Sequence, residues 1–398
     1  MAASPIVENV ADPSASAAAN LLVCLPSLPA DALERVRANV AAAFPTETVL
    51  IASPEAIPEN DRPQPSLLSY THQRSNFGWV LAAGDYLAAT DLALSTSAET
   101  VVLLGDHEIS STLLENFVAE IRTNHADLVL PRYTTNPTDG LVNSALLYPL
   151  TRVLFGVDVR FPLPLNAAFS RRAAERLGPA ASRLAANGAQ DSLLWPVAEA
   201  AVAVLRVRQT DAGERSLPHP SESDFNSLFA TVAGSLFVDI ETKAAFWQRT
   251  HSFTPYSPAV ASQPALEEAP EEIVPMVENF HLAYGNLQEI WSLVLPPQSL
   301  LALKRLSTAP PAAFTIAPQL WARIVYDFIL AFHLRTINRG HLLGAFTSLY
   351  LAWVASYLRS AGHSSSASSC VIAETESAFQ LEKPYLLARW RWPDRFNP

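Results

Sequence analysis

Short apolar runs alternate with helical patterns through the first third of the chain, and this alternation limits the fold more than any other feature of the sequence. The runs at residues 21–25, 48–52 and 101–104 are short and mostly aliphatic, and the last two are rich in β-branched residues. Runs of this kind are typical of strands buried on both faces of a sheet. Helical apolar spacing at residues 31–44, 78–94 and 112–122 separates or follows them, and a further strand is predicted at 127–131. Strands that alternate with helices predict an α/β fold whose mainly parallel sheet is covered on both faces.

The alternation ends after Tyr133. The sequence then predicts helices at 141–155, 171–185 and 191–203, an extended segment at 161–170 and a last strand at 202–207. Downstream, only helical apolar spacing is found, at residues 224–247, 273–294, 318–334, 341–358 and 371–390. We therefore predict a flexible leader at residues 1–19, an α/β domain at 20–222 and an all-α domain at 223–398.

The amino-acid composition indicates a globular protein and argues against several kinds of partner. The chain has 398 residues, of which 49% are hydrophobic, enough for about two or three globular domains. Its formal net charge of −11 argues against binding to nucleic acid or to anionic lipid. Two cysteines exclude a disulfide framework, and the N-terminal residues do not form a signal peptide, so a cytoplasmic location is expected.

One segment is apolar enough to raise the question of a membrane span. Residues 340–358 contain no charged side chain apart from His341. Glycine, serine and threonine dilute the segment, and similar helical patterns flank it. We therefore expect a buried bundle helix and no transmembrane segment.

Polar side chains gather where predicted strands end. Gly105 stops the run at 101–104, and Asp106, His107 and Glu108 follow it directly. Ligands bind outside the carboxyl ends of the strands in open α/β sheets. The full set of such side chains is Ser27, Asp106, Glu108, Thr138, Asp139 and Asp191. These oxygens suit a hard divalent cation, Mg²⁺ or Mn²⁺, to which His107 or His219 would add a nitrogen ligand. Turn and helix-capping roles also explain Asp106, Glu108 and Asp191, and each histidine could equally have a structural role as an exposed or hydrogen-bonded side chain. Both interpretations stay open.

The common nucleotide and hydrolase fingerprints are missing from the sequence. It contains neither G-x-G-x-x-G after a strand nor G-x-x-x-x-G-K-[ST], and neither H-E-x-x-H nor G-x-S-x-G. The chemistry therefore has to be inferred from less specific patterns.

The run from Asp139 to Ser144 and the run from Tyr148 to Arg152 resemble a bacterial branch of family 2 glycosyltransferases. More distantly, they are similar to mannosylglycerate and glucosylglycerate synthases. The likeness continues at 232–237, 321–328 and 349–351, and at Lys383-Pro384-Tyr385-Leu386. It implies the GT-A fold, in which a Rossmann-like nucleotide-sugar domain precedes a helical domain.

The resemblance also implies roles for individual residues. Ser27, Asp106 and Asn166 would bind the nucleotide sugar, and Asp191 would be the catalytic aspartate. The acceptor, a small hydroxy acid or glycan, would meet Arg132, Thr138, Asp139 and Asn143. Asp106, His107 and Glu108 would take the place of the Asp-x-Asp metal motif, with His219 as a further ligand. Partners would thus be a nucleotide sugar and a small acceptor, and self-association stays open.

Several family motifs are replaced in this chain. Leu163-Pro164-Leu165-Asn166 stands where the relatives have Gly-Gly-Asp, and no lysine replaces the Gly-Lys-Gly motif around residues 76–79. Two hypotheses follow. The chain is either a metal-dependent glycosyltransferase or a catalytically silent paralogue that uses the same fold for binding or assembly.

Overall fold

The computed structural model describes residues 20–26, 30–54, 65–70, 80–106, 109–186, 192–215, 222–250, 272–362 and 364–393. The chain divides into two compact units. Unit 1 comprises residues 1–133 and 161–213, and unit 2 comprises residues 134–160 and 214–398. The units are not consecutive blocks, because the segment 134–160, which the predicted domains assign to the α/β part, belongs to unit 2.

Unit 1 is built on a seven-stranded sheet with the strand order β3-β2-β1-β4-β6-β5-β7. Strands β1, β2 and β4 pair in parallel, as do β2 and β3, whereas β6 runs antiparallel to both β4 and β5. The strands are β1 (Leu21–Cys24), β2 (Val49–Ser53), β3 (Ser66–Ser69), β4 (Thr100–Leu104), β5 (Leu128–Thr134), β6 (Asn166–Ser170) and β7 (Val207–Glu214).

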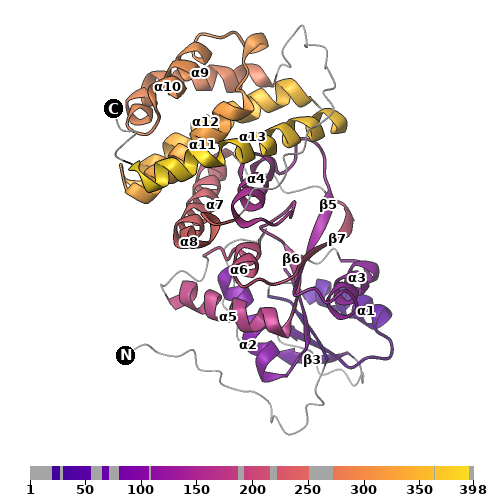
Figure 1. Cartoon of the computed structure of the whole chain (residues 1–398). Helices are drawn as coiled ribbons and strands as arrows, with labels where there is room; N and C mark the ends of the chain where they lie inside the picture. Colours follow the sequence, from indigo (N-terminus) through magenta and orange to yellow (C-terminus); the bar gives the residue numbers. More distant parts are fainter. Residues whose placement is uncertain are drawn as a thin grey trace. The chain divides into compact units, whose positions relative to one another are not determined.

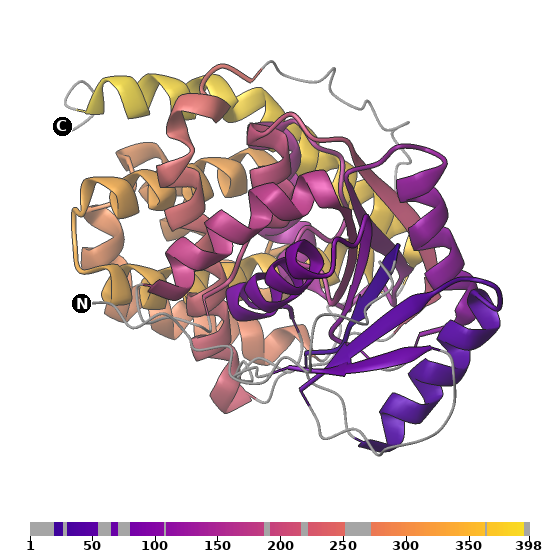
Figure 2. The same ribbon diagram turned by 90° about the horizontal axis from the view of Figure 1, so that it is seen from below.

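Helices cover both faces of this sheet. Figure 1 shows α1 and α3 on one side and α2, α5 and α6 on the other, and Figure 2 shows the sheet from below. The bounds are α1 (Ala30–Ala43), α2 (Ala83–Ser95), α3 (Ser111–Arg122), α5 (Arg171–Ala186) and α6 (Pro196–Val202). Apolar side chains of β1, β2 and β4 pack with those of α1 and α3 in a buried core. The predicted α/β class, with its mainly parallel sheet, is confirmed.

The sequence pattern misplaced the last strand. It predicts a strand at residues 202–207, but Val202 is the final residue of α6 and β7 begins at Val207. Val204 adopts a left-handed conformation with φ of 55°, which separates the helix from the strand. Strand β3 was also missed, because its SLLS sequence carries little apolar pattern and follows a stretch of sequence rich in proline.

The described elements of unit 2 are all helical, as predicted for the C-terminal part. Residues 143–155 form one continuous helix whose π-helical parts, η2 (Asn143–Leu147) and η3 (Thr151–Phe155), flank α4 (Tyr148–Leu150). The other elements are α7 (Glu222–Thr242), α8 (Ala244–Trp247), α9 (Ile273–Ser292), α10 (Pro297–Leu306), η4 (Pro311–Ala313), α11 (Pro318–Leu334), α12 (Arg339–Ala361) and α13 (Ser365–Arg391).

Helix α12 contains the apolar segment that raised the question of a membrane span. Among the described residues, it is the one helix long and apolar enough to cross a membrane. However, 78% of its most apolar stretch is buried inside the structure. Trp353 and Phe346 of α12 pack against Trp321 of α11, with ring centroids 5.9 and 5.8 Å apart. The helix therefore packs as a core helix of unit 2.

Candidate functional site

The carboxyl ends of β1 and β4 form the topological switch point of unit 1. From β1 the chain crosses to β2 on one side, and it later returns to add β4 on the other side of β1. The loops that leave two such strands diverge, which opens a crevice where α/β proteins bind ligands. Asp106 lies two residues beyond the end of β4, so the sequence pattern predicted its place correctly.

Asp106 is held at this edge through its backbone. Its N–H donates a hydrogen bond to Oδ1 of Asn166 (3.2 Å), and the Asn166 amide donates in turn to the Tyr133 hydroxyl (3.3 Å). Asn166 lies there because antiparallel β6 begins opposite Leu104, the last residue of β4. Asp106 is 8% exposed and Asn166 is 1% exposed. The structure thus brings together the two described residues among the three predicted to bind a nucleotide sugar.

The end of β4 is closely covered. The N–H of Gly105 donates to the Leu165 carbonyl oxygen at 2.9 Å, and the N–H of Leu81 donates to the Pro164 carbonyl oxygen at 3.3 Å. A Cβ atom on Gly105 would lie 2.6 Å from that Leu165 oxygen and 3.0 Å from a methyl group of Leu81. Glycine is required because the 161–165 loop passes directly over this position.

Several predicted site residues lie outside the described part of the chain. These are the predicted catalytic Asp191, the nucleotide-sugar residue Ser27, and His107, Glu108 and His219 of the metal set. In the described ranges, no group of three or more His, Cys, Asp or Glu side chains is arranged to hold a metal ion. Asp106 is the one predicted metal ligand that the structure describes.

The predicted acceptor residues divide between the two units. Arg132 lies on β5 of unit 1 with an exposed side chain, and the other three, Thr138, Asp139 and Asn143, lie in unit 2. Asp139 is 7% exposed and accepts a hydrogen bond from the Asn136 amide at 3.3 Å. The N–H of Asn143 donates to the Gly140 carbonyl oxygen at 2.9 Å, which closes the turn before η2. Within unit 2, Asp139 and Asn143 therefore shape the start of a helix.

Unit 2 contains buried charged contacts that no sequence pattern predicted. Arg152 of η3 pairs with Glu376 of α13 at 3.2 Å, and the Glu376 side chain is only 3% exposed. Burial raises the pKa of Glu376, and the nearby Arg152 guanidinium opposes this shift. The Lys383 ammonium donates to the carbonyl oxygens of Val153 (2.8 Å) and Thr250 (2.9 Å). Burial lowers the pKa of Lys383 to about 8.

A second buried pair joins α11 to α13. Arg389 pairs with Asp327, and the Tyr385 hydroxyl donates to the same Asp327 oxygen at 2.7 Å. Asp327 is 1% exposed, and burial raises its pKa to about 7 although Arg389 and Tyr385 oppose the shift. The Trp321 indole N–H donates to the Ala145 carbonyl oxygen at 2.9 Å.

These contacts connect the sequence segments that carry the family resemblance. Arg152, Trp321 and Lys383 each belong to one of the segments 139–152, 321–328 and 383–386. Within unit 2, Tyr385 bonds directly to Asp327 of the segment 321–328. Trp321 and Lys383 bond to the backbone of the helix at 143–155, at Ala145 and Val153. The resemblance marked these segments in the sequence, but it did not predict that they contact one another.

No protein-family model and no curated protein sequence matches the chain. Solved structures give weak likenesses. One is mannosyl-3-phosphoglycerate synthase from Rubrobacter xylanophilus, at 15% identity and a TM-score of 0.37, covering 64% of this chain and 84% of that one. Another is glucosyl-3-phosphoglycerate synthase from Mycobacterium tuberculosis, solved in complex with Mn²⁺, uridine diphosphate and glucosyl-3-phosphoglycerate. It has 14% identity and a TM-score of 0.35, covering 57% of this chain and 81% of that one.

A third likeness is to a protein described as a nucleotide-diphospho-sugar transferase, from Desulfovibrio desulfuricans. It has 12% identity and a TM-score of 0.29, covering 57% of this chain and 96% of that one. TM-scores this low do not establish a shared fold, so the three likenesses assign neither a family nor an activity to the chain.

Proposed function

We propose that unit 1 binds a nucleoside diphosphate sugar at the carboxyl ends of β1 and β4 and that the chain is a glycosyltransferase of the GT-A type. The observation that carries this proposal is the position of Asp106, a nearly buried carboxyl group at the topological switch point of the sheet. Ligands of α/β sheets bind at this point. The resemblance of the sequence to family 2 glycosyltransferases indicates which ligand class to test first.

The roles of individual residues form part of the same proposal. Asp106 and Asn166 would contact the donor, and Asp191 would orient the acceptor or stabilise developing charge. A small hydroxy acid or glycan is the proposed acceptor, with Arg132, Thr138, Asp139 and Asn143 as its contacts. The transfer would take place in the cytoplasm.

A divalent cation is part of the same proposal. Mg²⁺ and Mn²⁺ need several oxygen ligands, and Asp106 supplies at most two of them. The remaining ligands would come from residues beside it in the sequence, His107 and Glu108, and from His219. A bound cation would offset the charge that develops on the diphosphate leaving group.

Calorimetry with UDP- and GDP-sugars, with and without Mn²⁺, tests the proposal directly. We expect binding by the native chain and at least about tenfold weaker binding by Asp106→Asn, because one charge-assisted contact is lost. Glu115→Gln is the matched control, since Glu115 is an exposed carboxylate on the next helix, α3. Failure of the native chain to bind any of these sugars, or equal losses in the two variants, would refute the proposal.

A second candidate function is a binding or assembly module without catalysis. The covering of Gly105 by Leu165 and Leu81 favours it, because these residues occupy space directly at the end of β4. In that case Asp106→Ala and Asp191→Ala leave partner binding and phenotype unchanged. Loss of a measured transfer activity in either variant would exclude this candidate.

A further inference from the structure

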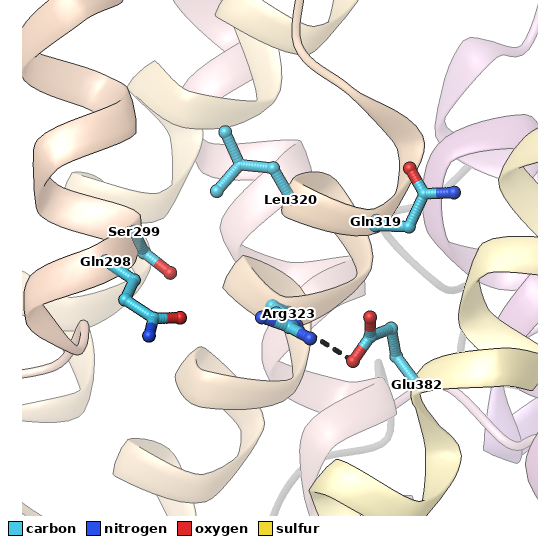
Figure 3. A pocket seen from close by; sticks show the side chains of 6 residues that line it. All are labelled: Gln298, Ser299, Gln319, Leu320, Arg323 and Glu382. Atoms are coloured by element: carbon cyan, nitrogen blue, oxygen red, sulfur yellow. Dashed lines mark hydrogen bonds and ion pairs between the residues drawn. The ribbon is translucent and has the colours of Figure 1, made fainter.

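A small pocket opens on the surface of unit 2, between α10, α11 and α13. Its volume is about 290 Å³, near the lower end of the roughly 300–1,000 Å³ of small-molecule sites. Five of its six lining side chains are polar: Gln298, Ser299, Gln319, Arg323 and Glu382, with Leu320 as the sixth. Figure 3 shows Glu382 on one side of Arg323, and Gln298 and Ser299 on the other. We propose that this pocket binds a small oxyanion, such as a phosphate monoester or a carboxylate, through Arg323 and Ser299.

Arg323 presents part of its guanidinium group to the pocket. Its Nε donates to Oε2 of Glu382 at 2.8 Å, and its guanidinium lies 5.5 Å from the ring centroid of Tyr385. The hydrogen bond to Glu382 raises the pKa of Arg323, so the group stays charged. Among the described residues, its two terminal amino groups have no acceptor. A guanidinium held at Nε keeps those amino groups for a second, bidentate partner, which is the geometry that carboxylate and phosphate oxygens fit.

Ser299 provides a second, independent observation. It is 3% exposed, it lines the pocket, and its hydroxyl forms no hydrogen bond with any described residue. Figure 3 shows this hydroxyl directed toward the space between α10 and α11. The hydroxyl therefore remains available to donate a hydrogen bond to a ligand in the pocket.

The start of α10 adds to the attraction for an anion. The helix begins at Pro297 without a side-chain cap, and its first hydrogen bond runs from the N–H of Leu300 to the Pro296 carbonyl oxygen. The N–H groups of Gln298 and Ser299 precede that bond. Such amides and the positive end of the helix dipole favour a negative charge nearby. A cationic ligand would be disfavoured by both features.

Titration of the full chain with inorganic phosphate and with acetate, followed by calorimetry, tests the inference. The native chain should bind at least one of the two. Arg323→Gln should weaken binding about tenfold or more, because a hydrogen-bonded ion pair is lost. Ser299→Ala should weaken it by about fivefold, the effect of one hydrogen bond. Arg305→Gln, which changes an exposed arginine of the same α10, should leave the affinity within about twofold of the native value.

A further variant distinguishes a loss of binding from a loss of folding. Arg323→Lys keeps the positive charge beside Glu382 but loses the bidentate fork, so it should bind more weakly than the native chain while remaining folded. Tighter binding of phosphate identifies a phosphate ester as the ligand class, and tighter binding of acetate identifies a carboxylate. Absence of binding to both anions, or equal losses in Arg323→Gln and Arg305→Gln, would overturn the inference. Asp106→Asn should not change anion binding here, so this test is independent of the proposed donor site.

Discussion

Charged and polar side chains serve different purposes at the strand ends of unit 1 and in the helical interior of unit 2. In unit 1, Asp106 sits beside the amide of Asn166, which contacts the Asp106 backbone rather than its carboxyl group. In unit 2, Asp327 and Glu376 are paired with arginines, and Lys383 joins two carbonyl groups. These charged side chains of unit 2 bond directly to groups on other helices or turns, so they hold the helices in place. The segments of unit 2 that resemble glycosyltransferases therefore contain residues that hold helices together. They do not indicate which residues of unit 1 would bind a ligand.

The largest effect is expected when a buried pair of unit 2 is broken. Arg389→Leu leaves the Asp327 carboxyl group buried without its cation, which costs about 3–5 kcal/mol of unfolding free energy. Asp327 can escape part of this cost by binding a proton, so the loss should be greater at pH 8 than at pH 5. Urea denaturation at both pH values measures it. Arg122→Leu in unit 1 is the control, because the Arg122–Glu47 pair is about one-third exposed and should contribute about 0–1 kcal/mol. Equal losses in the two variants would contradict the comparison.

Lys383→Met tests the other buried charge of unit 2. The carbonyl groups of Val153 and Thr250 lose their shared donor, with an expected cost of about 1–3 kcal/mol. Since burial lowers the pKa of Lys383 from 10.5 to about 8, the unfolded chain binds one more proton than the folded chain between these values. The native chain therefore gains stability as the pH rises from 8 to about 10.5, and Lys383→Met does not.

The stability difference between the native chain and Lys383→Met should consequently grow over this pH range. Denaturation at pH 8 and at pH 10 measures the difference. Lys304→Met, at an exposed lysine of α10, is the control and should show no such growth. A difference that shrinks with rising pH would show that Lys383 is not buried as the structure describes.

Alanine substitutions at one glycine in each unit test how tightly the two positions are packed. Gly105→Ala in unit 1 places a methyl group 2.6 Å from the Leu165 carbonyl oxygen, so we expect a loss of about 1–3 kcal/mol. Gly285→Ala in α9 of unit 2 meets no atom within 4 Å and should stabilise the chain by about 0.5–1 kcal/mol through helix propensity. Thermal denaturation of both variants gives the sign directly. A stabilising Gly105→Ala would show that the 161–165 loop does not cover the end of β4.

The smallest effect on stability is expected at the candidate donor site. Asp106→Asn keeps the size and shape of the side chain and the backbone hydrogen bond to Asn166, so the unfolding free energy should change by no more than about 1 kcal/mol. Urea denaturation and nucleotide-sugar calorimetry of this variant should therefore show a small change in stability together with a large loss of affinity. A large loss of stability without any effect on binding would give Asp106 the structural role that we assign to the charged residues of unit 2.

Much of unit 1 could be predicted because its elements carry local signals. The runs at residues 21–25 and 101–104 became β1 and β4, and the break at Gly105 placed Asp106 at a strand end. The antiparallel direction of β6 could not be predicted. Its extended character followed from Pro162 and Pro164, but its pairing with β4 depends on contacts between residues far apart in the chain.

In the helical part, too, local patterns predicted some elements and missed contacts between distant segments. Helical spacing predicted α11 and α13 closely, whereas α10 was missed because two prolines begin a short helix of weak pattern. Neither the pocket beside Arg323 nor the pairing of Arg152 with Glu376 has a local sequence signal. Each requires side chains from helices that are distant in sequence.

The sequence by itself determined most of the strands and helices, that the first part is α/β and the last part helical, and that Asp106 follows a buried strand. Local apolar periodicity and helix-breaking residues carry that information, because they act over a few neighbouring positions. The tertiary structure alone decided the strand order, the assignment of residues 134–160 to unit 2, and which charged groups are buried in pairs. These depend on contacts made only after the chain has folded, so no short stretch of sequence contains them.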